Sequence, residues 1–330
     1  MEKTSRPSQL FRNMSAKIAS IPMVLTALVI FVGCTVWSFI YSFTGSKLLP
    51  KKLFQWEEFA AIPIPTWIDK DGELNFSIVT GIVSKSWVGL KQYDRLWSNT
   101  RWITSLENLA LYAGFALVFS LVVGFILAAF MDQKIRFENT FRTIFLYPYA
   151  MSAIVTGLVW QWILNPTFGI EKIVKGWGFT DFEFAPLQNP DLVMFGILFA
   201  GIWQGTGFIM ALMLAGLRGI DEDIWKASRI DGIPMWKTYI RVVIPMMRPV
   251  FVTTLVLITA GILKVYDLVV AQTGGGPGLA SQVPAMYVYT YLFGAQNLGQ
   301  GLAASTMMLL SVLVILIPWT IIEFGGKEQR

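Results

Sequence analysis

Apolar stretches of about twenty residues alternate with shorter polar connectors along most of this chain. Such a stretch is about the length that an α-helix needs to cross the hydrocarbon core of a bilayer. We therefore predict an all-α polytopic membrane protein with six transmembrane helices in one membrane domain, residues 21–325. The expected spans are about residues 21–43, 105–130, 142–164, 192–217, 250–271 and 302–324. Short polar tails, residues 1–20 and 326–330, flank this domain.

The connector at residues 218–249 differs from the others because it is charged and also amphipathic. An acidic run at 221–223 places negative charge where a first helix would begin, which suits the helix dipole. Asp231 and Gly232 then interrupt the helical pattern, and Pro234 suits the first turn of a second helix. The sequence therefore predicts a helix, a glycine bend and a second helix, with apolar faces available for docking.

Composition excludes several kinds of chemistry. The chain is 55% hydrophobic and 14% charged, it has no histidine, and its single cysteine, Cys34, lies inside the first apolar stretch. Disulfides within the chain, cysteine-based metal sites and Ser-His catalysis are therefore not expected. No phosphate-binding GxxxxGK[ST] loop is present, so the chain would not hydrolyse ATP alone. We attribute the net charge of +5 to basic residues flanking the spans, and expect no nucleic-acid partner.

Basic residues indicate the orientation. The N-terminal tail, the connectors at 131–141 and 218–249, and the C-terminal tail are all basic, and with six spans they lie on one side. The positive-inside rule makes that side cytoplasmic. The other side would hold residues 44–104, 165–191 and 272–301. The first of these contains lysines, but acidic residues offset most of them and loops of about 60 residues obey the rule weakly. We expect the plasma (bacterial inner) membrane, with both termini cytoplasmic.

The 218–249 connector resembles the cytoplasmic coupling loop of ABC importer permeases. That loop reads Glu-Ala-Ala, three residues, Gly, and later a hydrophobic residue before Pro. The matching positions here are Ala227, Ser228, Asp231, Gly232 and Pro245. Two positions depart from the pattern, because Lys226 replaces the glutamate and Ser228 replaces the second alanine. The resemblance implies that these residues, together with Trp236, couple the chain to an ATPase subunit. Lys226 would then need an acidic partner or stay solvated.

Other segments resemble the carbohydrate subgroup of the same family. They are GLKQYDRLW (Gly89 to Trp97), FRTIFLYPYAMS (Phe141 to Ser152), GLVWQWILNPTFG (Gly157 to Gly169) and VYDLVVAQTGGGP (Val265 to Pro277). A Thr-Gly-Gly-Gly-Pro run after the fifth span is typical of carbohydrate permeases of the maltose type. Within that type, the sequence as a whole is similar to the α-glucoside branch. The resemblance implies the type I ABC importer permease fold.

The same resemblance implies a function and a set of partners. The chain would be a permease subunit that forms half of the translocation pathway of an ATP-driven importer of di- or oligosaccharides. Its partners would be a second homologous permease, two ATPase subunits that hold ATP and magnesium, an external sugar-binding protein, the carbohydrate and membrane lipid. The chain itself would hold no cofactor or metal and would not be an enzyme.

Polar and aromatic residues at membrane depth are candidates for the substrate pathway. Sugars need polar groups to replace water on their hydroxyls and aromatic faces for their C–H surfaces. The expected pathway residues are Tyr149, Ser152, Gln204, Lys264 and Asp267. Lys264 and Asp267 lie three residues apart on one helical face, so they could also serve only to neutralise each other.

Glycines are the main feature of two further segments. Gly274, Gly275, Gly276 and Pro277 cannot continue a helix, so they end the fifth span, and they could also form an outer gate or contact the binding protein. Small residues beginning at Gly201 form stripes in the fourth span that favour close helix packing.

One proline and two tryptophans in or near the third span have expected structural roles. Pro148 is expected to kink the third span. Trp160 and Trp162 are expected to anchor at the membrane interface, and the alternative is contact with the sugar.

Two other functions remain open at this stage. An ion- or proton-driven secondary transporter could use Lys264 and Asp267 as coupling groups, although we find no paired broken helices of an inverted repeat. An intramembrane enzyme would need a nucleophile and base or a metal-binding acidic motif, and the chain has no histidine. Co-purification with an ATP-binding subunit would separate the importer from the secondary transporter.

Overall fold

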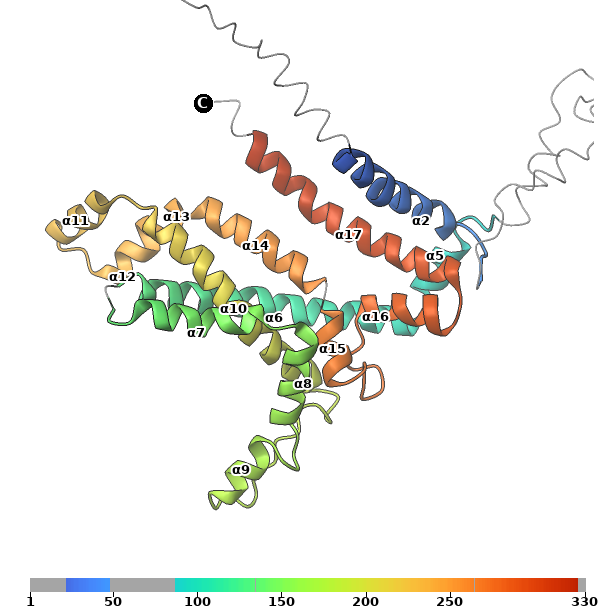
Figure 1. The fold of residues 1–330 in the computed structure, drawn as a ribbon, viewed down its shortest axis with the longest axis horizontal. Coiled ribbons are helices and arrows are strands. Elements are labelled where there is room, and N and C mark those ends of the chain that lie inside the picture. The colour runs from blue at the N-terminus through green and yellow to red at the C-terminus, as the bar shows by residue number, and fades with distance from the viewer. Residues whose placement is uncertain (1–21, 48–86, 134, 264, 326–330) are drawn as a thin grey trace, which may run out of the picture. The chain divides into compact units, whose positions relative to one another are not determined.

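The structure is a computed structural model that describes residues 22–47, 87–133, 135–263 and 265–325. Regular structure in these ranges is helical, apart from one antiparallel bridge between Thr44 and Trp87. Figure 1 shows the order of the helices. Their bounds, with π-helical turns marked η, are η1 (Leu28–Gly33), α2 (Cys34–Ser42), α5 (Lys91–Trp97), α6 (Thr100–Met131), α7 (Glu138–Ala150), α8 (Ala153–Ile163), α9 (Ile170–Gly176), α10 (Val193–Arg218), α11 (Glu222–Ile230), α12 (Met235–Thr238), η3 (Tyr239–Val243), α13 (Ile244–Met246), α14 (Arg248–Ile262), α15 (Tyr266–Gln272), α16 (Pro284–Tyr289), η4 (Thr290–Gly294) and α17 (Leu298–Gly325).

The chain divides into two compact units. The first comprises Met1–Leu96 and Tyr291–Thr306, and the second comprises Trp97–Thr290 and Met307–Arg330. In the first unit, the Gln92 amide donates to Thr44 O over 3.0 Å. The start of α17 joins the same place, where Gly299 N donates to Ser46 O over 2.9 Å. A methyl group on Gly299 would collide with the Thr44 carbonyl, so this close backbone approach requires glycine.

Long apolar helices match the expectation of a membrane protein. Pro22–Ser42, Thr100–Met131 and Val193–Arg218 are each long and apolar enough to cross a bilayer. Two bent helix pairs raise the number of candidate spans in the described residues to as many as five. In α17, residues 298–314 form an apolar helix that is shorter than the candidate spans. The count of six spans stays a prediction.

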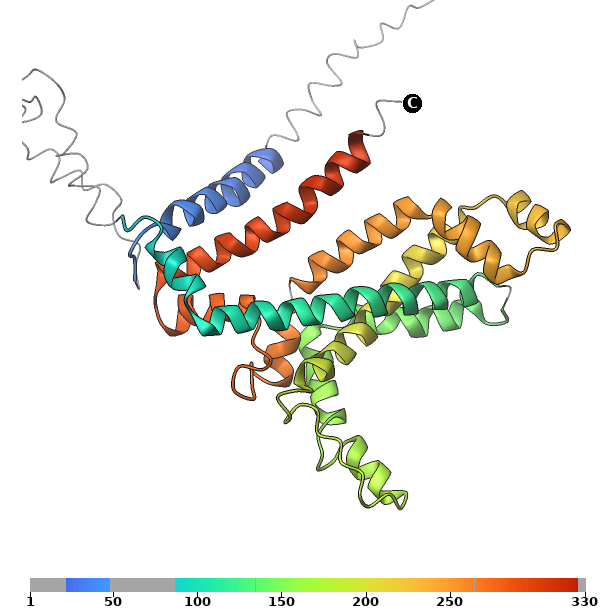
Figure 2. The same ribbon diagram turned by 180° about the vertical axis from the view of Figure 1, so that it is seen from behind.

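The stretch expected as a straight third span is broken. α7 ends at Ala150, α8 starts at Ala153, and the two helices meet at 99°. Met151 and Ser152 between them are extended. Pro148 lies just before this break, and its ring removes one backbone donor from the helix. The expected kink by Pro148 is therefore a sharp turn a few residues later, which Figures 1 and 2 both show.

The stretch expected as the fifth span, residues 250–271, is also divided. α14 ends at Ile262 and α15 begins at Tyr266. Before α14, the helical segment Met235–Met246 meets Arg248–Ile262 at 74°. Pro249 lies in the first turn of α14, where its missing N–H removes no helical bond. The apolar stretch at 250–271 is therefore interrupted by a turn between α14 and α15, which hydropathy alone does not predict.

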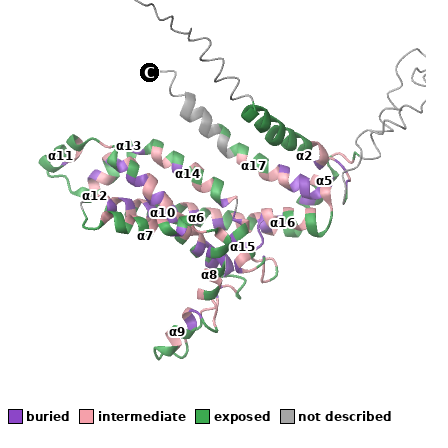
Figure 3. Cartoon of the chain, viewed as in Figure 1, coloured by how far each residue is buried: buried purple, intermediate pink, exposed green. Residues whose placement is uncertain are grey.

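α10 is the central helix of the second unit and packs against α6, α7, α8, α14 and α15. Figure 3 shows that buried residues concentrate along it, whereas the residues of α9 are exposed or intermediate apart from Glu171. Close packing depends on two of the expected small residues. The Tyr112 hydroxyl on α6 lies against Gly201, and the Phe145 carbonyl on α7 lies against Gly207. The stripe beginning at Gly201 is thus a packing feature at these two positions.

Candidate functional site

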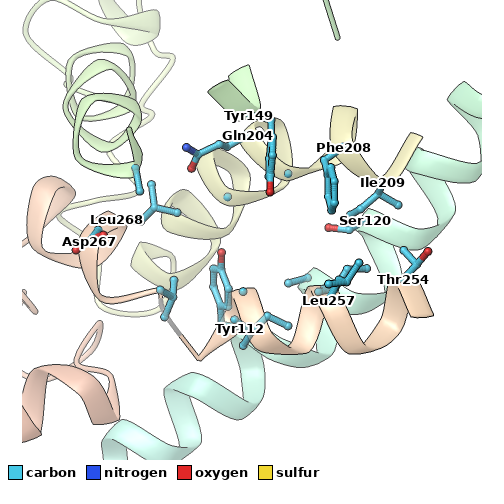
Figure 4. Close-up of a pocket in the computed structure, with 18 of the residues that line it drawn as sticks. Tyr112, Ser120, Tyr149, Gln204, Phe208, Ile209, Thr254, Leu257, Asp267 and Leu268 are labelled. Atoms are coloured by element: carbon cyan, nitrogen blue, oxygen red, sulfur yellow. The ribbon is translucent and has the colours of Figure 1, made fainter. Parts of the chain in front are cut away.

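A cavity of about 400 Å³ lies in the second unit, bounded by α6, the end of α7, α10, α14 and the start of α15 (Figure 4). Most of its wall is apolar. Its polar groups come from Tyr112, Ser120, Tyr149, Gln204, Thr254 and Asp267. Its volume falls within the range of small-molecule sites, about 300–1,000 Å³. It therefore offers an apolar surface with a few well-placed polar groups.

Tyr149 and Gln204 are brought together at one end of this cavity by the break after α7. The Tyr149 ring stacks on Phe208, with the two ring centroids 4.6 Å apart and the planes 8° from parallel. The Gln204 amide donates to Met151 O over 2.9 Å, at the turn between α7 and α8. This bond fixes the Gln204 side chain and satisfies a carbonyl that the broken helix leaves without a partner. The turn thus holds an aromatic face and an amide side by side.

The other three residues expected in the substrate pathway differ in their positions relative to the cavity. Asp267 lines the cavity from the first turn of α15. Ser152 is the N-cap residue of α8 but makes no side-chain cap bond and does not line the cavity. Lys264 lies outside the described residues, so its suggested pairing with Asp267 stays a prediction.

Tyr112 is a cavity residue that the sequence did not single out. It is buried in α6, and its hydroxyl lies beside Gly201 of α10. Because Gly201 has no side chain, the phenol can reach the cavity wall. The signal available in the sequence was the small-residue stripe of α10, but the stripe does not say which side chain lies opposite it.

Trp160 and Trp162 of α8 lie in different surroundings. The Trp160 ring packs near Phe199 and Trp203, with centroid distances of 5.7 Å and 5.9 Å. Trp162 is exposed. Trp160 therefore joins an aromatic cluster whose other members, Phe199 and Trp203, are exposed, while Trp162 keeps an open position that suits a bilayer interface.

The segment 221–245 folds as a helix, a bend and a second helix. The Asp221 carboxylate accepts from Asp223 N over 2.9 Å and caps α11. Gly232 has φ of +63°, a conformation that glycine adopts at no steric cost. The chain then enters α12 after Pro234. These elements follow the helix–bend–helix prediction from the sequence.

A buried hydroxyl pair joins the two helices of this segment. Ser228 of α11 hydrogen-bonds Thr238 of α12, and both side chains are buried. Ile233 N also donates to Ser228 O over 3.0 Å. The departure at Ser228 therefore has a structural reason, because an alanine there would leave the Thr238 hydroxyl without this partner.

Lys226 pairs with carboxylates of its own helix. Its ammonium lies 2.9 Å from the Asp223 carboxylate and 3.9 Å from that of Glu222. All three side chains are exposed, so these pairs contribute at most about 1 kcal/mol. Lys226 is thus exposed and also paired one helical turn earlier in the same segment, and its contact with an ATPase subunit stays a prediction.

Apolar side chains are exposed around the bend. Ile230 is 85% exposed and Trp236 is 62% exposed, and the Lys237 ammonium lies 5.4 Å from the Trp236 ring. Ile233 and Met235 are also exposed. Among the other candidate residues of this segment, Ala227 lies within α11, Asp231 is its C-cap and Pro245 lies within α13. A folded segment with apolar groups on its surface has the properties of a docking element.

Arg218 ties together three helix ends at the base of this segment. Its guanidinium lies 2.5 Å from the Glu138 carboxylate at the start of α7 and 3.8 Å from that of Asp132 after α6. It also donates to Met131 O over 3.4 Å. Burial raises the pKa of Asp132, while Arg218 opposes that shift. This ion-pair network links the connector 131–141 to the root of the 221–245 segment.

The glycine run after α15 forms a tethered loop. Gly274 and Gly275 have positive φ, and Thr273 shares a hydrogen bond of 2.7 Å with Ser281 across the loop. Asn108 of α6 donates to Leu279 O over 3.0 Å and also to Gln282 O. Gly276 and Pro277 follow in the same turn. The run ends α15, as expected, and α6 holds the loop that follows.

Comparison with known proteins places this architecture. A family model described as "Binding-protein-dependent transport system inner membrane component" matches residues 120–323. A probable ABC transporter permease protein of Pyrococcus horikoshii is 33% identical over 258 residues, which cover 78% of this chain and 88% of that protein. The trehalose/maltose transport system permease protein of Thermococcus litoralis is 29% identical over 241 residues, which cover 72% and 79% respectively.

A solved structure has the same fold. It is that of a bacterial ABC transporter involved in the import of the acidic polysaccharide alginate, with a TM-score of 0.73 over 95% of this chain and 96% of that one. Sequence identity in this comparison is 17%, so the likeness concerns the fold alone. The chain therefore belongs to the family of binding-protein-dependent transport system inner membrane components, and it is a multi-pass inner-membrane permease subunit with the ABC importer permease fold.

Proposed function

We propose that this permease subunit lines half of the translocation pathway for a neutral di- or oligosaccharide. The observation that carries the proposal is the pairing of the Tyr149–Phe208 stack with the Gln204 amide at one cavity wall. An aromatic face suits the C–H surface of a sugar ring, and an amide can both donate to and accept from its hydroxyls. Several relatives are named as sugar permeases, including those for trehalose/maltose and for xylose/arabinose.

The charge of the described lining residues favours a neutral substrate. Asp267 is the one charged side chain in the described lining, and it is an anion. A carboxylate or phosphate ligand would meet repulsion there and would find no cation among the described lining residues. A neutral polyol avoids this cost. An α-glucoside satisfies these requirements.

The 221–245 segment is proposed to dock on a partner ATPase subunit. Its exposed Ile230 and Trp236 supply apolar contact, and the Ser228–Thr238 hydrogen bond holds its two helices as one body. Lys226, Ala227, Asp231 and Pro245 would lie in or beside this contact. The Arg218 network would pass motion of the segment to α6, α7 and α10, since it joins their ends.

The chain is a transport subunit and not an enzyme, so ATP and magnesium would be held by its partners. We propose an assembly of two homologous permeases, two ATPase subunits and an external sugar-binding protein. The termini and the 221–245 segment would face the cytoplasm. The loop at Gly274–Pro277 would face the binding protein or act as an outer gate, with Asn108 anchoring its far side.

A matched pair of tyrosine variants tests the proposed substrate site. Tyr149 and Tyr147 lie two residues apart at the end of α7, and both are exposed, but Tyr149 alone lines the cavity. In proteoliposomes containing the full assembly, Tyr149→Ala should raise the KM for the transported sugar about tenfold. That corresponds to the loss of about 1.4 kcal/mol of aromatic contact. Tyr147→Ala should leave KM unchanged. Equal effects of the two variants, or no effect of either, would reject the proposed site.

A further inference from the structure

A second pocket lies at the C-terminal ends of α8 and α15, two helices whose first turns line the cavity. It has a volume of about 420 Å³, and its polar lining comes from Gln161, Asn165, Gln188, Gln272 and Thr273. These residues belong to the end of α8, the loop before α10 and the end of α15, and we call this the loop pocket. No charged residue lines it, and all of the segments that form it are described.

Much of the hydrogen-bonding capacity of this pocket is unused. Gln272 is 3% exposed, and neither atom of its side-chain amide has a partner among the described residues. A buried amide without partners is costly, so a polar ligand or water that reaches it would be stabilised there. Gln161 uses its amide nitrogen to donate to Gln272 O over 3.1 Å, which leaves its carbonyl oxygen available. Asn165 uses its carbonyl oxygen to accept from Thr167 N, which leaves its NH₂ group available.

Further unpartnered groups lie on α8 between the loop pocket and the cavity. Ala153 of α8 and Leu268 of α15 line the cavity, whereas Gln161 and Gln272 of the same helices line the loop pocket. Between them, the Thr156 hydroxyl and the Trp160 indole N–H are buried without partners. They lie four residues apart, on one face of α8. These buried polar groups lie on α8 between the two pockets, and neither residue lines the cavity or the loop pocket.

We propose that the loop pocket is a second binding site, which holds one unit of a neutral saccharide outside the cavity. Amides offer both donors and acceptors, which matches sugar hydroxyls, and the lack of charge disfavours phosphates and carboxylates. The volume is that of a small-molecule site. This inference rests on the proposed function, because it extends the same substrate class to a second place on the chain.

Protection of an engineered cysteine tests the site without relying on transport. Gln188 is exposed at the rim, and Cys34 is the only natural cysteine. In the full assembly in nanodiscs, a Cys34→Ser, Gln188→Cys chain is labelled with a membrane-impermeant maleimide, with and without maltose. We expect maltose to slow labelling at least fivefold, and galacturonate, an acidic sugar, to slow it little. Thr180→Cys in the same background is exposed outside the pocket and should show no protection.

A second variant tests the chemistry of the site. Asn165→Asp keeps the oxygen that accepts from Thr167 N but removes the available NH₂ donor. It should raise the maltose concentration for half-protection at least fivefold. Tyr149→Ala, which alters the cavity, should leave protection at Gln188→Cys unchanged while it alters transport.

The outcomes separate this site from the proposed function. Labelling that no neutral sugar slows would overturn the loop-pocket site, even if the assembly transports sugars normally. The site would also be overturned if the binding protein slowed maleimide labelling equally with and without sugar, because a protein surface would then cover the pocket. Failure of the unmodified assembly to transport any sugar would reject the proposed function, and the labelling result would still decide the site.

Discussion

Gly232 sets the bend between α11 and α12, and a series of substitutions there should grade the coupling of the transporter. Its φ is +63°, and a Cβ at this position would meet nothing within 4 Å. A side chain therefore adds conformational strain without a collision. Alanine in the left-handed region costs about 1–2 kcal/mol, and asparagine costs less because its side chain tolerates this conformation. Since 1.4 kcal/mol is tenfold in an equilibrium, Gly232→Ala should shift the bent segment toward other conformations by about 5- to 30-fold.

Proline at this position is a more severe change. Its ring fixes φ near −65°, about 130° from the observed value, and it removes the N–H that donates to Arg229 O over 3.2 Å. The bend cannot then form as observed. ATP-driven sugar uptake should decrease in the order glycine, asparagine, alanine and proline, with the proline variant inactive. The protein should still reach the membrane, because this segment lies outside the proposed spans.

Gly178 provides a matched control for backbone strain. Its φ is +103° and a Cβ there also meets nothing within 4 Å, but it lies in the loop between α9 and α10. Gly178→Ala should leave uptake near normal. Each variant is expressed with its partners, quantified in the membrane and assayed for initial uptake rate. A Gly232→Pro assembly with normal expression and normal uptake would refute the coupling role of the bend.

Three further predictions follow from packing and charge. Gly207→Ala forces a methyl group into the Phe145 carbonyl and should destabilise the α7–α10 contact by about 1–3 kcal/mol. Gly205→Ala, which has open space around it, should leave stability unchanged. Denaturation of both variants in detergent measures the difference. A double-mutant cycle of Arg218→Gln and Glu138→Gln should give a coupling free energy of about 0.5–1 kcal/mol in the same assay. Additive effects of the two substitutions would show that the ion pair does not contribute to stability. The pKa of Glu171 is lowered, first by the hydrogen bond from Lys175 and then by the bond from the backbone N–H of Phe184. A lowered folded-state pKa means that its stabilisation is present above the ordinary value of 4.5 and is lost as the pH falls through the folded value. The protection of backbone amides around α9, measured by hydrogen exchange and corrected for the intrinsic rate, should therefore fall in acid, and Glu171→Gln should remove this pH dependence.

Local signals made the 221–245 segment predictable. An acidic cap at Asp221, a glycine that permits positive φ and a proline at the next helix start all act within a few residues of their effect. The pairing of Ser228 with Thr238 was not predictable, because it depends on how the two helices fold back on each other. Lys226 likewise could be assigned a partner only once the geometry of α11 was known.

The cavity was predictable in part. Tyr149, Gln204 and Asp267 share polar or aromatic character at membrane depth, which single-residue chemistry identifies. Tyr112 and Phe208 could not be found this way, because their roles depend on packing across helices, against Gly201 and Tyr149 respectively. The sharp turn between α7 and α8 was anticipated only as a kink, since Pro148 weakens a helix without setting the direction of the chain after it.

The driving force for uptake tests the central claim most directly. Proteoliposomes containing the assembly, with the binding protein on the outer side, are loaded with ATP and given a radiolabelled neutral disaccharide. Uptake should require internal ATP and the binding protein, and it should persist when an ionophore abolishes proton and sodium gradients. Uptake that an imposed ion gradient drives without ATP would contradict the account, and would instead support a secondary transporter.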